Sequence, residues 1–467
     1  MKHLLFSISI IGSIINWSDE DVPNSGFGKI TRVGIYSDGD LYQCVFQRNK
    51  IYNPRWTSNS WAKLHNPNAS PDVVSNFHPD GPQAIYINYT SGENNVIRYN
   101  EFFSDNGNKY NDVIGGSTNA SYTGFLGGDS DIYGNYVANA FDDAIEADGG
   151  NRNMRIWNNY IEDTYTAISN TPTSIDPLYI WRNVSGQSYR PPGSKFGQYG
   201  NFIKMGTSNS DNANWMNGNV YIFHNTIFQN SNGGFGGLGT RLNSDNFPSN
   251  RIIRHCYTQN NIFEVRDPNS INSISIRSGS DPNFDNNYDY DLLNANYPNG
   301  YEINGISNQV PTYNNPGFEF NTKTGNFFLT NNSYGFDNRI IIPNFSYVYN
   351  GNATDMGVYE NGDLPLVYGI NATTVEFPLD DTLYINEQNN TYNYQIYPNP
   401  ANNILKISTN TNTVLTNYVI RNTLGQKVLS GTLNSNLEIK IDHLNSGIYF
   451  TEISNENQSI TKQFIKK

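Results

Sequence analysis

The chain has 467 residues, of which only 15% are charged, and it is rich in Gly, Tyr and Phe. Gly permits left-handed turns and aromatic residues favour strands, so this composition indicates an all-β protein. The formal net charge of −13 argues against general nucleic-acid binding, which requires a basic surface. It leaves open an anionic polysaccharide held in a local basic groove.

The N-terminus, MKHLLFSISIIGSIIN, combines a basic start with a short apolar run. This run is too short to cross a bilayer, so no transmembrane span is predicted. Residues 1–20 resemble a secretory signal peptide, although no small-x-small cleavage site follows. The alternative is that Ile8 to Trp17 forms a β-strand of a chain that begins further upstream.

An apolar residue three positions before an asparagine recurs along the first half of the chain. Two successive intervals between these asparagines are 24 residues, and the longer intervals fit the same unit with loop insertions. A fixed period of this length is typical of a solenoid. The pairs are Phe46/Asn49, Ile97/Asn100, Ile132/Asn135, Ile156/Asn159, Ile180/Asn183 and Ile222/Asn225, and Asn261 can extend the series.

A second series of short strands, each centred on an apolar pair, accompanies the asparagine units. We therefore expect residues 21–362 to form a parallel β-helix, with coils about 4.8 Å apart and a ladder of stacked Asn amides. Cys44 and Cys256 would lie near opposite ends of this ladder, too far apart for a disulfide. The apolar pairs are Ala84-Ile85, Val113-Ile114, Ala144-Ile145, Ala167-Ile168 and Phe202-Ile203.

This pattern resembles that of right-handed parallel β-helix proteins, many of which act on polysaccharides. The resemblance extends to three closing segments, Asp281-Pro-Asn-Phe, Asn315-Pro-Gly-Phe and Asp355-Met-Gly-Val-Tyr-Glu360. It implies a right-handed coil, an extracellular polysaccharide partner and a monomer. Fold alone does not fix an activity.

The stretch from Phe141 to Ile161 contains the densest acidic group in the β-helix. With the Ile of each apolar pair pointing inward, the neighbouring residues form two columns across successive coils. Glu146 and Lys204 should share one outer face, and Asp112 should lie one coil from Asp143. Asp142 and Asp148 should project outward too, giving a solvent-facing row of carboxylates. The columns read Tyr86, Gly115, Glu146, Ser169, Lys204 and Gln83, Asp112, Asp143, Thr166, Asn201.

Two chemistries fit these residues. In the first, carboxylates bind Ca²⁺ through hard oxygen ligands and Lys204 removes a proton from a uronate by β-elimination. The segment Phe202-Ile-Lys204-Met-Gly206, following an Asp-Asp strand, resembles calcium-dependent pectate lyases that use a lysine base. The predicted metal ligands are Asp112, Asp142, Asp143, Glu146 and Asp148, and Arg152, Arg182 and Arg190 are predicted to bind substrate carboxylates.

In the second chemistry, Asp143 and Glu146 act as the acid and base of a glycoside hydrolase, and Lys204 only donates a hydrogen bond. A non-catalytic polysaccharide-binding β-helix is the third possibility, because acidic turns often hold a structural Ca²⁺ or simply face water. His78 and His224 fit packed or turn histidines better than catalytic bases. The segment from Asp285 to Asp291 begins like a calcium loop but lacks its Gly and closing Glu, which predicts a solvated turn.

After a linker at residues 363–393, residues 394–467 follow a different pattern. Alternating apolar runs predict the antiparallel strands of a small β-sandwich. The ordered motifs are Tyr397-Pro-Asn-Pro-Ala401, Gly425-Gln-Lys-Val, Leu444-Asn-Ser-Gly-Ile-Tyr-Phe450 and Lys462-Gln-Phe-Ile-Lys-Lys467. They resemble the C-terminal sorting domain of the type IX secretion system of Bacteroidetes. The resemblance implies export across the outer membrane, contact with that machinery, and a secreted or cell-surface location.

Overall fold

The chain divides into two compact units, residues 1–377 and 378–467. The structure, a computed structural model, is almost entirely β, with two short 3₁₀ turns, η1 (Val74–Phe77) and η3 (Gly369–Asn371). Within the described part of the chain, no helix has the length and apolar character of a membrane span. The structure describes residues 9–11, 14–16, 33–38, 40–54, 57–88, 92–116, 124–170, 175, 177–186, 188, 201–205, 207–208, 218–229, 235–237, 251–252, 255–265, 285–294, 302–314, 327–346, 349–372, 394–409, 417–422, 426–454 and 459–467.

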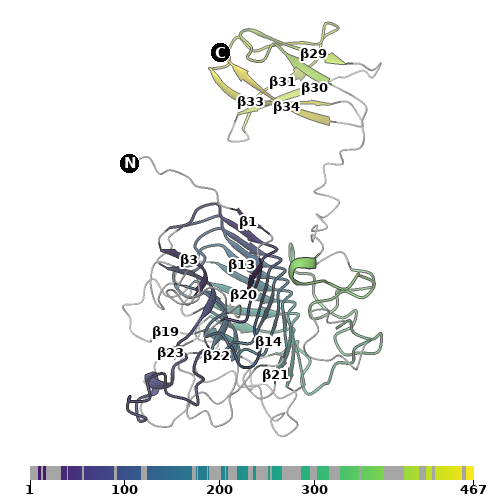
Figure 1. The fold of residues 1–467 in the computed structure, drawn as a ribbon. Coiled ribbons are helices and arrows are strands. Elements are labelled where there is room, and N and C mark those ends of the chain that lie inside the picture. The colour runs from purple at the N-terminus through teal and green to yellow at the C-terminus, as the bar shows by residue number, and fades with distance from the viewer. Residues whose placement is uncertain are drawn as a thin grey trace. The chain divides into compact units, whose positions relative to one another are not determined.

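Three parallel sheets form the first unit, and successive turns of the chain add strands to each of them (Figure 1). Sheet 1 contains β1 (Ser9–Ile11), β4 (Val45–Gln47), β7 (Val96–Arg98), β10 (Asp131–Tyr133), β13 (Met154–Trp157), β16 (Leu178–Trp181), β20 (Val220–Phe223), β24 (Cys256–Gln259) and β26 (Asn287–Tyr288). Sheet 2 contains β2 (Ile14–Asn16), β5 (Lys50–Tyr52), β8 (Glu101–Phe103), β11 (Tyr136–Ala138), β14 (Tyr160–Glu162), β17 (Val184–Ser185), β21 (Thr226–Gln229), β25 (Ile262–Val265) and β27 (Leu292–Leu293).

Sheet 3 positions the predicted site. It contains β3 (Val33–Asp38), β6 (Gln83–Asn88), β9 (Ile114–Gly115), β12 (Asp143–Glu146), β15 (Thr166–Ser169), β18 (Asn201–Met205) and β22 (Phe235–Gly237). A separate antiparallel pair joins β19 (Thr207–Ser208) to β23 (Arg251–Ile252). The architecture confirms the predicted right-handed parallel β-helix.

The inward residues of the coils stack on one another to form the core. Ile132 pairs with Ile97 and Ile156 in sheet 1, and equivalent isoleucines pair across sheet 3. These side chains are fully buried, and burial of each contributes about 2 kcal/mol. Cys44 and Cys256 are both buried and free. The repeated Ile thus sets the register of every coil.

The asparagine ladder is present at the corner between sheets 1 and 2. The Asn135 amide N and Nδ2 donate to Asn159 Oδ1 at 3.1 and 2.9 Å, and the same pattern runs from Asn49 to Asn261. The last acceptor is Asp291, whose Oδ1 accepts from Asn261 N and Nδ2. The prediction that Asp285 to Asp291 form a solvated turn is therefore wrong at Asp291. Asp291 is fully buried because it terminates the ladder.

A C-terminal strap, residues 327–346 and 349–372, covers the outer face of sheet 2 (Figure 1, green). It runs back along the coils, from Gly357, which donates to Asn260 O, to Gly369, which donates to Gly134 O. Near its end, Arg48 Nη1 and Nη2 donate to two strap carbonyls at 2.6 and 3.0 Å. The strap ties late coils to early ones and buries aromatic side chains that a solvated sheet would expose.

The second unit contains two antiparallel sheets around one core. One sheet is β28 (Tyr394–Tyr397), β29 (Ile404–Thr409) and β32 (Glu438–Lys440), and the other is β31 (Lys427–Thr432), β30 (Asn417–Asn422), β33 (Gly447–Ser454) and β34 (Ser459–Lys466). Leu405, Ile420, Ile453 and Phe464 alternate inward and are buried. The period-two pattern of the sequence produces this small sandwich, as predicted.

Candidate functional site

The two predicted columns of sheet 3 are present in the predicted register. Glu146 pairs with Ser169, and Ser169 pairs with Lys204, so Glu146 and Lys204 belong to one column two coils apart. In the other column, Asp143 pairs with Thr166, and Thr166 with Asn201. The inward Ile of each strand fixes this placement, because a shift by one residue would turn the polar column into the core.

Three aspartates converge beside these columns. Asp112, Asp142 and Asp143 each present a carboxylate oxygen, and these oxygens all lie within 4.8 Å of one another. We call them the aspartate trio. Asp112 precedes β9, and its Oδ1 accepts from the Asp143 amide at 3.0 Å. This hydrogen bond links the two coils where β9 and β12 begin, so both aspartates lie at the N-terminal ends of neighbouring strands of sheet 3.

Lys204 forms an ion pair with one member of the trio. Its ammonium contacts Asp143 Oδ2, while Asp143 Oδ1 is buried and has no hydrogen-bond partner among the described residues. Asp143 is fully buried, whereas 16% of the Lys204 side chain remains exposed. A buried carboxylate oxygen without a donor is costly unless a proton or a cation completes it.

The charges of the cluster shift the pKa values of its members. Burial, followed by the charge of Asp143, raises the pKa of Asp112 to about 6 and holds that of Asp142 well above its ordinary value. For Lys204, burial alone would lower the pKa, but the surrounding carboxylates, Asp143 first, raise it well above the ordinary value. Lys204 is therefore protonated in this structure, and the carboxylates repel one another.

Glu146 lies at the outer margin of the cluster. A side chain on Gly115 would come within 2.7 Å of Glu146 Oε2, so the glycine of the preceding coil leaves the space that Glu146 occupies. Burial, followed by the charge of Asp112, raises the pKa of Glu146 well above its ordinary value. Asp148 is fully buried, and its Oδ1 accepts from Ser169 Oγ at 2.5 Å. Glu146 and Asp148 are not members of the trio.

The expectation of a solvent-facing row of carboxylates is wrong. Asp142, Asp143 and Asp148 are at most 3% exposed. Part of the reason is the insertion at residues 53–82, which precedes β6 and brings His78 Nε2 to 3.4 Å from Asp142 Oδ2. Trp61 of the same insertion packs edge-on against His78, with ring centroids 5.0 Å apart. The insertion covers the cluster on the side of Asp142.

His78 is a site residue that sequence reasoning missed. Its distance from the acidic stretch along the chain gave no signal, and its His-Pro-Asp-Gly-Pro context fitted a turn. Its Nδ1 lies 2.9 Å from Pro79 O, so this nitrogen donates the hydrogen bond and Nε2 faces Asp142. Asn59 fixes the backbone beneath it, because Asn59 Nδ2 donates to His78 O at 3.2 Å.

The predicted substrate-binding arginines lie in three different situations. Arg152 is exposed, and its Nη2 contacts Glu93 Oε2 at 2.5 Å. Arg182 lies apart from the cluster at the corner between β16 and β17, where only 2% of it is exposed and its Nη1 donates to Val358 O at 2.5 Å. The structure thus commits Arg182 to the C-terminal strap. Arg190 falls outside the described residues.

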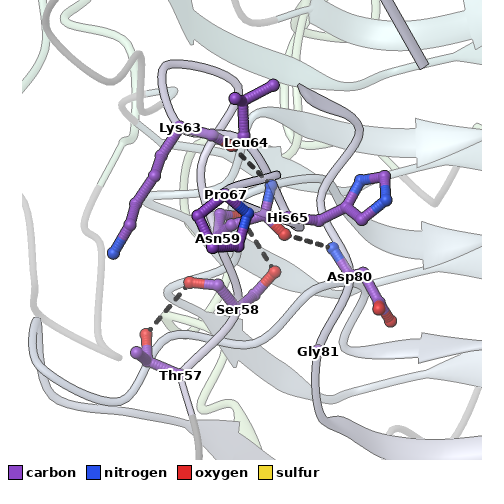
Figure 2. Close-up of a pocket in the computed structure, with 9 residues that line it drawn as sticks. All are labelled: Thr57, Ser58, Asn59, Lys63, Leu64, His65, Pro67, Asp80 and Gly81. Atoms are coloured by element: carbon purple, nitrogen blue, oxygen red, sulfur yellow. Dashed lines mark hydrogen bonds between the residues drawn. The ribbon is translucent and has the colours of Figure 1, made fainter. Parts of the chain in front are cut away.

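A separate cavity of about 400 Å³ lies within the insertion (Figure 2). Its walls include Ser58, Asn59, Lys63, His65 and Asp80, and none of its lining residues belongs to the aspartate trio. Figure 2 shows Asn59 at its centre, where Asn59 Oδ1 accepts from the Asp80 amide at 2.8 Å. The aspartate trio and this cavity are therefore separate features of the β-helix unit.

Comparison with known proteins identifies the second unit. Residues 395–467 match the family described as the secretion system C-terminal sorting domain. No curated protein matches the chain. The sorting domain indicates that the protein is exported by the type IX system to the cell surface or the extracellular space, and that this tail interacts with the type IX machinery. The chain is thus a secreted parallel β-helix that carries a type IX sorting domain.

Proposed function

We propose that the β-helix unit is a calcium-dependent lyase that cleaves an extracellular uronate-containing polysaccharide by β-elimination. The observation that carries this proposal is the aspartate trio with Lys204 paired to one of its members. Three convergent carboxylates suit a hard divalent cation, and Asp143 Oδ1, which accepts no hydrogen bond from the described residues, could be one of its ligands. Asp112, Asp142 and Asp143 would hold the ion, which when bound neutralises a uronate carboxylate and acidifies the adjacent carbon.

Lys204 would be the base. Asp143 cannot bind the Lys204 ammonium and a metal ion equally well. Its use as a metal ligand would therefore weaken the ion pair that keeps Lys204 protonated. The neutral Lys204 Nζ then takes the proton from C5 of the uronate. The electron pair forms the C4–C5 double bond, and the bond from C4 to the glycosidic oxygen breaks.

Glu146 would return a proton to the departing oxygen. It lies in the same column as Lys204, it is partly exposed, and its raised pKa keeps the carboxyl protonated where an ordinary glutamate would be ionised. Each turnover then leaves one proton on Lys204 and removes one from Glu146, so the step balances. Exposed Arg152, which pairs with Glu93, would bind a neighbouring sugar carboxylate by exchanging this partner.

A glycoside hydrolase is the second candidate, and the raised pKa of Glu146 favours it specifically. A carboxyl group whose pKa is raised by burial and by neighbouring carboxylates suits the acid that protonates a glycosidic oxygen. In that mechanism Lys204 only donates a hydrogen bond, and the product carries no double bond.

The products distinguish these functions. Full-length protein is incubated with a panel of uronate polymers, with and without Ca²⁺, and ultraviolet absorbance and reducing ends are followed. We expect calcium-dependent absorbance that falls by at least roughly 100-fold in Lys204→Ala. Lys63→Ala, which removes an exposed lysine from the insertion, is the matched control and should retain activity. Reducing ends without absorbance would favour the hydrolase. Absence of both signals would favour a non-catalytic binding protein.

A further inference from the structure

The sorting domain has an apolar patch on the outer face of its four-stranded sheet. In β33 the residues alternate, and Tyr449, Thr451 and Ile453 point into the sandwich. Ile448 and Phe450 point outward and are 43% and 38% exposed. The solvated face of an antiparallel sheet is normally polar, so large apolar side chains at these positions require an explanation.

The patch continues onto the neighbouring strand. Ile448 lies directly opposite Ile465 of β34, which is 42% exposed, so the two side chains are cross-strand neighbours on the same face. Val428 of β31, at the irregularity between β30 and β31, is a further exposed apolar side chain, and β30 separates its strand from β33. These residues come from three strands, so folding of the domain is required to assemble the patch.

Charged residues border the patch. Arg421 of β30 lies opposite both Phe450 and Lys427, and both basic side chains are exposed. The outward row of β33 also carries one acidic side chain, Glu452. Residues 395–467 contain seven Lys and Arg against four Asp and Glu, a net charge of +3 in a chain whose formal net charge is −13. A second copy of this domain would bring like charges together, which disfavours self-association through this face.

We propose that this face, centred on Ile448, Phe450 and Ile465, is the surface by which the type IX secretion machinery recognises the protein. Its occupant would be a machinery protein with an apolar surface and an acidic rim. Two observations select that occupant: the patch lies entirely within the residues that match the sorting-domain family, and its basic border suits an acidic partner better than another copy.

The sandwich itself supplies a matched control. Ile404 of β29, on the other sheet, is 37% exposed, close to the exposure of the patch residues. Ile404→Ser removes an isoleucine about as exposed as each one removed from the patch, so a general effect of such a change on folding or solubility should appear there too. Only loss of a specific contact should separate them.

The test is export of the full-length protein from a bacterium with a type IX system, measured by immunoblotting of periplasm, cell surface and medium. We expect Ile448→Ser/Ile465→Ser to reduce the exported fraction by roughly tenfold, with accumulation in the periplasm, and Ile404→Ser to export normally. Normal export of the double variant, or equal loss in both, would overturn the proposal.

Two further measurements keep the test decisive. If the double variant is degraded, the single Phe450→Gln change, which leaves the Ile448 and Ile465 pair intact, must reduce export while thermal unfolding of the purified chain is unchanged. Size-exclusion chromatography of the wild type tests whether a second copy of the chain occupies this face instead. A dimer that Phe450→Gln dissociates without loss of export would show that the face binds a second copy and would reject the proposal.

Discussion

The β-helix contains two groups of buried carboxylates that are completed in different ways. At the end of the ladder, Asp291 accepts from Asn261 and from Thr258, and Glu302 Oε2 accepts from the Asp291 amide at 2.9 Å. In the aspartate trio, by contrast, Lys204 contacts Asp143 and His78 faces Asp142. The ladder end is completed by amide and hydroxyl donors. In the trio, amide donors serve Asp112, whereas Asp142 and Asp143 are faced by a histidine and a lysine side chain.

This difference shows which feature indicates function. Burial raises the pKa of Asp291 to about 6, as it does for Asp112, so a perturbed pKa occurs in both groups. A structural ladder cap and a candidate site cannot be separated on that ground. Only the trio combines convergent carboxylate oxygens with a partly exposed lysine. The following predictions test whether the two groups differ as their contacts indicate.

The largest difference should be in cation binding. Asp142→Asn removes a carboxylate from the trio without breaking the ion pair of Lys204 with Asp143, and we expect calcium affinity to fall by roughly 100-fold. The matched control is Asp291→Asn, the same substitution in the other group, which should leave the affinity unchanged. Isothermal titration of Ca²⁺ into the full-length proteins measures both. Equal losses, or no binding by the wild type, would contradict the assignment.

A smaller effect, on stability, should appear at the ladder end. Asp291→Ala leaves the backbone N of Asn261 buried without an acceptor and removes one acceptor of its Nδ2, which still donates to Ile222 O. We expect a loss of about 3 kcal/mol in the free energy of unfolding of the β-helix. Asp291→Asn keeps an Oδ1 acceptor, as at every earlier position of the ladder, and should cost less than about 1 kcal/mol. Urea unfolding followed by circular dichroism compares them. Similar losses would mean that the negative charge, not the acceptor, matters.

The sequence predicted the parts of this architecture that follow from its period. The interval of 24 between Asn135 and Asn159 matches the spacing of the ladder hydrogen bond, and the inward Ile placed Glu146 and Lys204 in one column. Each coil repeats the same local pattern, so register could be read from one turn to the next. The sorting domain was equally accessible, because its motifs lie in order within residues 395–467.

The contacts made by insertions and by the strap could not be predicted. Arg182 binds Val358, which is 176 residues away, and His78 reaches Asp142 from an insertion in an earlier coil. Such contacts depend on how loops fold over the solenoid, and no period specifies them. The burial of the carboxylates was misjudged for the same reason. Asp291 was missed because an aspartate replaces asparagine where the ladder ends.

The smallest expected effect concerns the proton that completes the ladder end. Burial, followed by the charge of Asp291, raises the pKa of Glu302 to about 10, while Asp289 opposes and Arg339 favours its ionisation. The folded protein therefore keeps a proton on Glu302 that the unfolded chain releases near its ordinary pKa of 4.5. The stability that this group contributes is full below pH 4.5 and is lost as the pH rises toward about 10.

Glu302→Gln reproduces the protonated carboxyl at every pH and should flatten this dependence. We expect the variant to unfold at the same temperature as the wild type near pH 4 and at a higher temperature near pH 8. Thermal unfolding across that range measures the slope, with Glu452→Gln in the sorting domain as a control that should leave it unchanged. A slope as steep in Glu302→Gln as in the wild type would mean that Glu302 does not hold this proton in the folded protein. The ladder end would then need a cation as much as the trio does, and the contrast between the two groups would disappear.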